Sequence, residues 1–147
     1  MIPSFTDQGL LPQGIHAATW TEITERFGFS EHRQKLLEGL RLGLENLALA
    51  GCQTAYLDGS FVTQKPNPND FDVCWEVAGV NPVLLEPELL LFRHARAEQK
   101  AKYQGEFMPS QIVAQLQPSL TYLEFYQLEK TTQAPKGIIL INLQEGL

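Results

Sequence analysis

The sequence is poor in cysteine and contains no long apolar run. Its only cysteines are Cys52 and Cys74, and their spacing matches no zinc-binding pattern. We therefore expect two buried free thiols in a reducing compartment. Every apolar run is far shorter than the roughly 18 residues of a membrane-spanning helix, and residues 1–20 lack the pattern of a targeting signal. These absences predict a soluble, cytoplasmic protein without a membrane partner.

Positive charge is also scarce. The chain has 11 lysine and arginine residues against 17 aspartate and glutamate residues, which gives a net charge of −6. An acidic chain does not bind nucleic acid through its whole surface, although one local basic patch is compatible with this balance. No repeat, low-complexity tract or linker interrupts the sequence. Its 147 residues and 44% apolar content predict a single domain, residues 1–147, with a sizeable core.

One stretch, residues 58–75, combines turn residues with paired acids and reads DGSFVTQKPNPNDFDVCW. Gly59 and Ser60 follow a short apolar run, and backbone N–H groups and a hydroxyl at such a turn can bind a phosphate. Asp70 and Asp72 begin a second apolar run, so in a strand they share one face, about 7 Å apart. Two carboxylates so arranged can bind one divalent ion or an adjacent pair.

Apolar periodicity and turn residues outline the remaining elements. The clearest helix is 31–50, because Ser30 can cap it, its leucines share one face and Gly51 can end it. Further helices are expected within 15–27, over 87–100 and over 118–127. Strands are expected at 53–58, 70–77, 103–108 and 138–143, the first two being neighbours joined by a stiff, proline-rich loop. The fold class is therefore α+β, a small mixed β-sheet packed with helices.

Together, Gly59, Ser60, Asp70 and Asp72 resemble the signature of the nucleotidyltransferase superfamily, in which Gly-Ser precedes a loop and then Asp-x-Asp on a strand. Residues 57–75 and the later PKGIILINL are similar to small bacterial nucleotidyltransferase-like proteins. The resemblance implies a polymerase-beta-like fold. It also implies an enzyme that uses Mg²⁺, with Mn²⁺ as an alternative, and moves a nucleotide from a nucleoside triphosphate to an acceptor.

The superfamily carries a third acidic residue on a neighbouring strand. By this resemblance Asp70, Asp72 and Glu106 would bind the metal ions and serve catalysis, because Glu106 lies in an expected strand. Glu124, in an expected helix, and Glu76, further along the second strand, are the alternatives. The metal ions would offset charge on the phosphoryl oxygens and orient the attacking and leaving groups.

The nucleotide needs positive charge, and many relatives carry an arginine soon after Gly-Ser that this chain lacks. The residues assigned to the nucleotide are therefore Gly59, Ser60, Lys65, Arg93 and Arg96. The last two belong to the one basic concentration in the chain, which also contains Lys100 and Lys102. Helical spacing would place Arg93, Arg96 and Lys100 on one face. Ordinary solvated side chains are the alternative for this group and for Lys65. Asp58 has the simpler interpretation of a cap on the turn at Gly59.

Two function classes follow from the resemblance. The first is a nucleotidyltransferase acting on a protein, an RNA or a small molecule, in the context of a toxin–antitoxin or phage-defence pair. The second is a catalytically inactive binding module, a nucleotide sensor or a partner-binding protein. The helical domain with which larger relatives grip the acceptor has no counterpart in this sequence, so we expect a partner protein or a homodimer to choose the acceptor.

Overall fold

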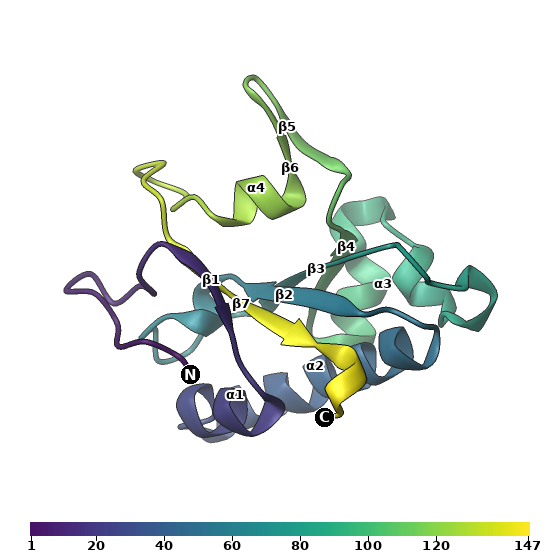
Figure 1. Cartoon of the computed structure of the whole chain (residues 1–147), viewed down its shortest axis with the longest axis horizontal. Helices are drawn as coiled ribbons and strands as arrows, with labels where there is room; N and C mark the ends of the chain where they lie inside the picture. Colours follow the sequence, from purple (N-terminus) through teal and green to yellow (C-terminus); the bar gives the residue numbers. More distant parts are fainter.

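The computed structural model describes residues 1–147 as an α+β fold built on a mixed, five-stranded sheet (Figure 1). The strand order is β1-β7-β2-β3-β4. The central strand β2 is antiparallel to both of its neighbours, whereas the outer strands β1 and β4 run parallel to theirs. The strands are β1 (Gly14–Ala17), β2 (Thr54–Asp58), β3 (Phe71–Trp75), β4 (Gly105–Pro109) and β7 (Gly137–Asn142).

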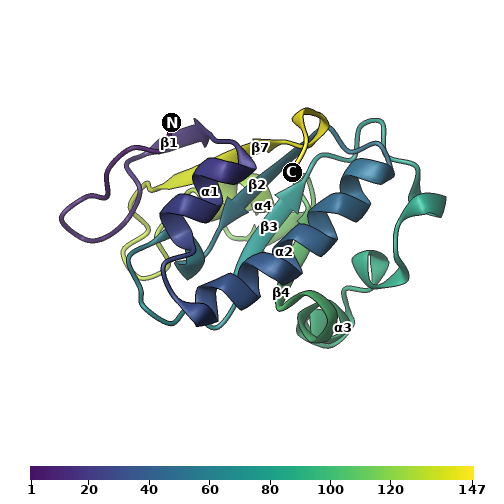
Figure 2. The same ribbon diagram turned by 90° about the horizontal axis from the view of Figure 1, so that it is seen from below.

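Two helices cover one face of this sheet, α1 (Trp20–Phe27) and α2 (Glu31–Leu49) (Figure 2). The Ser30 side chain caps α2 by accepting a hydrogen bond from the backbone N–H of Arg33. The apolar face of α2 packs on the inward residues of the sheet, and each buried leucine contributes about 1.5–3 kcal/mol relative to an exposed one. This main core includes Leu36, Leu40, Leu44, Leu47, Phe71, Val73, Phe107 and Ile139.

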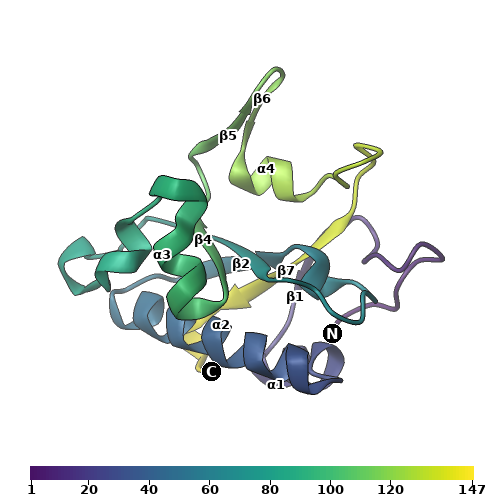
Figure 3. The same ribbon diagram turned by 180° about the vertical axis from the view of Figure 1, so that it is seen from behind.

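A smaller layer covers part of the opposite face. It consists of the short helix α4 (Tyr122–Tyr126), beside which the hairpin of β5 (Val113–Leu116) and β6 (Ser119–Thr121) projects away from the sheet (Figures 1 and 3). Its apolar contacts centre on Cys74, Tyr126 and Ile138. Because successive strand residues alternate in direction, residues flanked by main-core positions, such as Asp72, point towards this second layer.

Helix α3 (Arg93–Tyr103) lies beside the edge strand β4 (Figure 3). Its buried Gln99 side chain donates a hydrogen bond to the carbonyl of Phe107 at 3.0 Å and accepts one from the Phe107 N–H at 2.8 Å. The amide of Gln99 therefore takes the place of a further strand at this edge. The same two hydrogen bonds fix the backbone immediately after Glu106.

Several expected elements are confirmed with small changes in length. The helix expected at 31–50 is α2, and the strands expected at 53–58, 70–77, 103–108 and 138–143 are β2, β3, β4 and β7. Strands β2 and β3 are neighbours, as expected. Both cysteines are buried free thiols. No helix has both the length and the apolar character that crossing a membrane requires.

Two expected helices need correction. The helix expected over 118–127 begins only at Tyr122, because the residues before it pair with β5 as strand β6. The helix expected within 15–27 is confirmed as α1, which begins after Thr19, while residues 14–17 form strand β1, whose partner β7 lies at the other end of the chain. The helix expected over 87–100 is a 3₁₀ turn, Pro87–Leu90, followed by α3. Pairing with a remote segment leaves no local periodic signal, which explains why strand β1 was missed.

Candidate functional site

Three carboxylates form a row across the sheet on the α4 side. Asp58 on β2 is the register partner of Asp72 on β3, and Asp72 is the register partner of Glu106 on β4. Register partners on adjacent strands point to the same face and stand about 4.8 Å apart. Asp70, two residues before Asp72, joins the row. Carboxylate oxygens of Asp70, Asp72 and Glu106 all lie within 4.8 Å of one another, a grouping suited to a metal ion.

Of the candidates for a third carboxylate, Glu106 is the one that lies beside Asp70 and Asp72. Glu124 instead caps helix α4, where its Oε1 accepts a hydrogen bond from the backbone N–H of Thr121 at 2.9 Å. Glu76 follows the end of β3, and its charge acts on the hydroxyl of Tyr56. Glu106 is favoured because β4 runs parallel to β3 in a register that aligns it with Asp72.

Gly59 connects the row to the turn that follows β2. Its φ of +87° lies in the left-handed region that glycine tolerates best. A Cβ at this position would lie 2.7 Å from Oδ2 of Asp72, well inside van der Waals contact. Ser60 then opens the 3₁₀ turn Ser60–Val62. The Gly-Ser turn therefore lies directly against the carboxylate of Asp72.

The loop between Ser60 and Asp70 is held by a buried arginine at the start of α2. The fully buried guanidinium of Arg33 donates hydrogen bonds to the carbonyls of Phe27, Phe61, Thr63 and Lys65 at 2.6–3.1 Å. Burial lowers the pKa of Arg33 to about 10, still far above neutrality. Sequence reasoning missed this residue. The available signal was its position three and four residues before Leu36 and Leu37, on the apolar face of the helix.

Cations occupy both ends of the row. Glu106 accepts hydrogen bonds from the Arg96 guanidinium, at 2.9 Å from Nη2, and lies 3.1 Å from Nζ of Lys100. At the other end, Lys136 forms a buried ion pair with Asp58. Lys136 lies 78 residues away in sequence, and nothing local predicts that it pairs with Asp58. Asp58 is therefore the ion-pair partner of Lys136, a role that its interpretation as a turn cap did not include.

Charge crowding and burial shift the pKa values of the central acids. Burial, followed by the charges of Asp58 and Glu106, raises the pKa of Asp72 to about 8. Burial and the charge of Glu106 also raise the pKa of Asp70. Burial alone would raise the pKa of Glu106, but the hydrogen bonds from Arg96 and Lys100 outweigh it and hold that pKa below its usual range. The ends of the row are thus compensated by cations, whereas Asp72 in its middle has none and keeps its proton near neutrality until a cation binds.

The remaining cations of the basic concentration do not share one helix face. Arg93 pairs with Glu98 at 2.7 Å, and Lys102 pairs with Glu86 and Glu88. The expectation of a common face fails because His94, Ala95 and Arg96 have φ values of 51–61°, so the chain is not a regular right-handed helix there. Only Arg96 and Lys100 of this group contact the row. The side chain of Lys65 is exposed, and its charge acts on Asp70.

A tyrosine of α4 completes the surroundings of the row. Tyr126 is 5% exposed, and its hydroxyl has no hydrogen-bond partner. Burial raises its pKa well above the usual value, and the neighbouring charge of Asp72 adds to this. The hydroxyl therefore stays protonated and is available as a donor close to Asp72. An unsatisfied buried donor costs about 1–3 kcal/mol, so a bound group that accepts from it is favoured.

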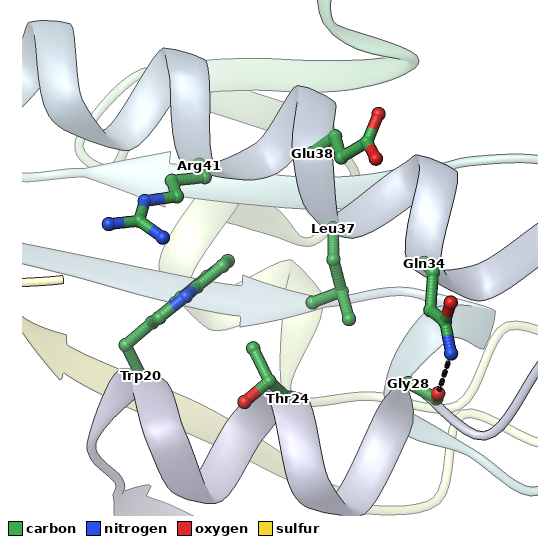
Figure 4. A pocket seen from close by; sticks show the side chains of 7 residues that line it. All are labelled: Trp20, Thr24, Gly28, Gln34, Leu37, Glu38 and Arg41. Atoms are coloured by element: carbon green, nitrogen blue, oxygen red, sulfur yellow. Dashed lines mark hydrogen bonds between the residues drawn. The ribbon is translucent and has the colours of Figure 1, made fainter.

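Two hollows elsewhere on the molecule lack comparable chemistry. One of about 330 Å³ lies between α1 and α2, on the side of the sheet opposite the carboxylates (Figure 4). Its wall includes Trp20, Leu37 and Arg41, and the Gln34 amide across it donates to the carbonyl of Gly28 at 3.0 Å. A second, of about 350 Å³, lies between the start of α1 and the end of the chain. Neither brings titratable groups together as the row does.

Comparisons with known proteins identify a family but no activity. Neither the curated proteins nor the solved structures contain a match to this chain. The family model that matches spans residues 3–142, nearly the whole sequence, and is described as a family of unknown function, DUF6932. The chain therefore belongs to the DUF6932 family.

Proposed function

We propose that this protein is a metal-dependent nucleotidyltransferase with the polymerase-beta-like fold. It would move a nucleotide from a nucleoside triphosphate to a protein, an RNA or a small molecule. The observation that carries the proposal is the convergence of Asp70, Asp72 and Glu106 within 4.8 Å, next to a Gly-Ser turn. Because all of these ligand atoms are carboxylate oxygens, the group suits a hard cation such as Mg²⁺ or Mn²⁺.

The surroundings fit a hard divalent ion and disfavour a soft one. Cys74 points to the same face two residues after Asp72, but burial raises the pKa of its thiol, which keeps it protonated. Arg96 and Lys100 already lie against Glu106, which indicates that this face attracts positive charge. When bound, the ion would supply charge compensation for a phosphoryl group.

Other residues of the chain would bind and position the phosphate groups of the nucleotide. Gly59 lets the backbone approach Asp72 closely, so the Gly-Ser turn would lie beside a phosphate bound at the carboxylates. Arg96 and Lys100 would compensate phosphate charge, with Lys65 from the neighbouring loop. Arg33 keeps that loop in place through its bonds to backbone carbonyls. Preorganised charges of this kind lower the barrier without reorganising during the reaction.

The direct test uses the intact chain, each α-³²P-labelled ribonucleoside triphosphate and Mg²⁺, with cell RNA, cell protein and small-molecule acceptors assayed separately. We expect label in one acceptor class, and loss of at least about 1,000-fold in Asp72→Asn because removing a metal ligand removes charge stabilisation. Asp7→Asn, at an exposed aspartate near the start of the chain, is the matched control. Labelling by Asp72→Asn within tenfold of the wild type would defeat the proposal.

A second candidate function is a nucleotide-binding module without catalysis. The observation in its favour is that Arg96 and Lys100 already satisfy Glu106, so a metal ion must compete with two cations for that carboxylate. Such a module would bind a nucleoside triphosphate with Mg²⁺ in equilibrium dialysis and transfer no label to any acceptor. Nucleotide binding that Asp72→Asn abolishes, without transfer, would favour this candidate.

A further inference from the structure

The ion pair of Lys136 with Asp58 is a fixed part of the carboxylate row. The two side chains are only 11% and 6% exposed. Lys136 comes from the segment just before β7 and lies against the register partner of Asp72. A buried charge without its partner is strongly unfavourable, so separating the Lys136 ammonium from Asp58 would cost free energy. One positive charge is thus built into the β2 end of the row.

The distribution of charge leaves one gap for a further cation. Asp58 is compensated by Lys136, and Glu106 is compensated on its outer side by Arg96 and Lys100. Asp70 and Asp72 form no ion pair, although both are partly buried and lie within 4.8 Å of Glu106. The carboxyl groups that lack a cation are therefore confined to the middle of the row.

Tyr126 is an independent sign that a ligand belongs at this gap. Its side chain is more than nine-tenths buried, its hydroxyl has no partner, and the charges of Asp72, Asp58 and Glu106 act on it. A phenol that stays protonated can donate to an oxygen bound near the carboxylates, such as a phosphate oxygen or a water ligand of a cation. No group of the protein accepts a hydrogen bond from this hydroxyl.

We propose that the row takes a single divalent cation, bound by Asp70, Asp72 and Glu106, and that the Lys136 ammonium takes the place of a second one. This inference rests on the metal site of the proposed function. Two-metal sites hold their ions about 3.5–4 Å apart, which requires carboxylates free to face both ions. Here Lys136 occupies Asp58, the carboxylate that with Asp72 would complete a second position.

The test counts ions on the intact chain by Mn²⁺ titration, with free Mn²⁺ measured by electron paramagnetic resonance. The wild type should bind one ion. Lys136→Gln frees Asp58 and should bind two. The double variant Asp58→Asn/Lys136→Gln removes both charges of the pair, and it should return to one ion with a Kd within about threefold of the wild type. Lys35→Gln, at an exposed lysine of α2, is the control and should bind one ion as the wild type does.

The outcomes separate this inference from the proposed function. Two ions on the wild type, or a single ion on folded Lys136→Gln, would overturn the inference and leave the metal site standing. Binding of no ion by the wild type would overturn both. If Lys136→Gln does not fold, the count on the wild type and on Lys136→Arg decides: one ion on each supports the inference, and two on the wild type refute it.

Discussion

Asp72 on β3 and Glu106 on β4 are register partners across a parallel strand pair. Parallel partners on one face bring two acids together although 33 residues separate them in sequence. Asp58 adds a third carboxylate from the antiparallel side. Such a row is unfavourable unless cations compensate it. The structure supplies cations at both ends and leaves Asp72 in the middle, which determines how the site should respond to metal, pH and mutation.

Metal should stabilise the folded protein. An ion that binds the native state and not the unfolded chain adds about 2.7 kcal/mol at 100 times its Kd. We expect Mg²⁺ or Mn²⁺ to raise Tm in the wild type, as measured by calorimetry after dialysis against EDTA. Asp70→Asn should abolish the rise, whereas Asp7→Asn should retain it. An equal rise in Asp70→Asn would place the ion elsewhere.

The metal-free protein should become less stable as pH rises. The pKa of Asp72 is about 8 in the folded protein and about 3.9 in an unfolded chain, so the folded form binds more protons between these values. Its free energy of unfolding therefore falls as pH increases through about 4 to 8. Asp72→Asn cannot ionise at this position. The free energy of unfolding of this variant should therefore exceed that of the wild type by more at pH 8 than at pH 5. Urea titrations of both proteins in EDTA at pH 5 and pH 8 measure these free energies. The same difference between the two proteins at both pH values would contradict the prediction.

The two cations on Glu106 should act on metal and nucleotide in opposite directions. Arg96→Gln/Lys100→Gln removes competitors for Glu106, so Mn²⁺ should bind several-fold more tightly, whereas the triphosphate should bind about tenfold more weakly at low salt. High salt should reduce the difference in triphosphate affinity between the double variant and the wild type, because the attraction is electrostatic. Isothermal titration at two ionic strengths measures both.

Arg93→Gln/Lys102→Gln is the matched control for that experiment. It removes the same formal charge from the same helix, but these side chains pair with Glu98, Glu86 and Glu88. Its effect on the triphosphate should be clearly smaller. If the two double variants weaken nucleotide binding equally, general charge and not contact with Glu106 accounts for the effect.

Arg33 should matter for stability far more than an exposed arginine of the same helix. Arg33→Lys cannot donate to all four backbone carbonyls and should lower the free energy of unfolding by about 2–4 kcal/mol. Arg41→Lys, at a side chain about half exposed, should change it by less than about 0.5 kcal/mol. Denaturant titration compares the two. Similar losses would show that the buried guanidinium does not hold the loop.

Gly59→Ala should combine backbone strain with a clash against Asp72. The new Cβ would lie 2.7 Å from Oδ2 of that carboxylate at a φ of +87°. We expect a loss of stability of more than about 1 kcal/mol and weaker Mn²⁺ binding. Gly146→Ala isolates the strain, because φ is +96° there and no atom lies within 4 Å of the new Cβ. Unchanged Mn²⁺ affinity in Gly59→Ala would separate the turn from the metal site.

Local periodicity in the sequence determined a large part of the fold. The leucines of α2 recur at helical spacing, and strand alternation alone places Asp70 and Asp72 on one face. The apolar runs also indicate β2, β3, β4 and β7 within a few residues. These features depend on backbone geometry within one segment, so they are visible without knowledge of its neighbours.

Tertiary structure alone decided which charges meet. The register of β4 on β3 brings Glu106 to Asp72, and the start of β7 brings Lys136 to Asp58. A shift of one residue in either register would turn these side chains to the other face. The left-handed backbone at 94–96 likewise separates Arg96 from Arg93, which no helical spacing rule anticipates. The sequence determined where the acids lie along each strand, whereas pairing between remote strands determined their partners, because register depends on the packing of the whole sheet.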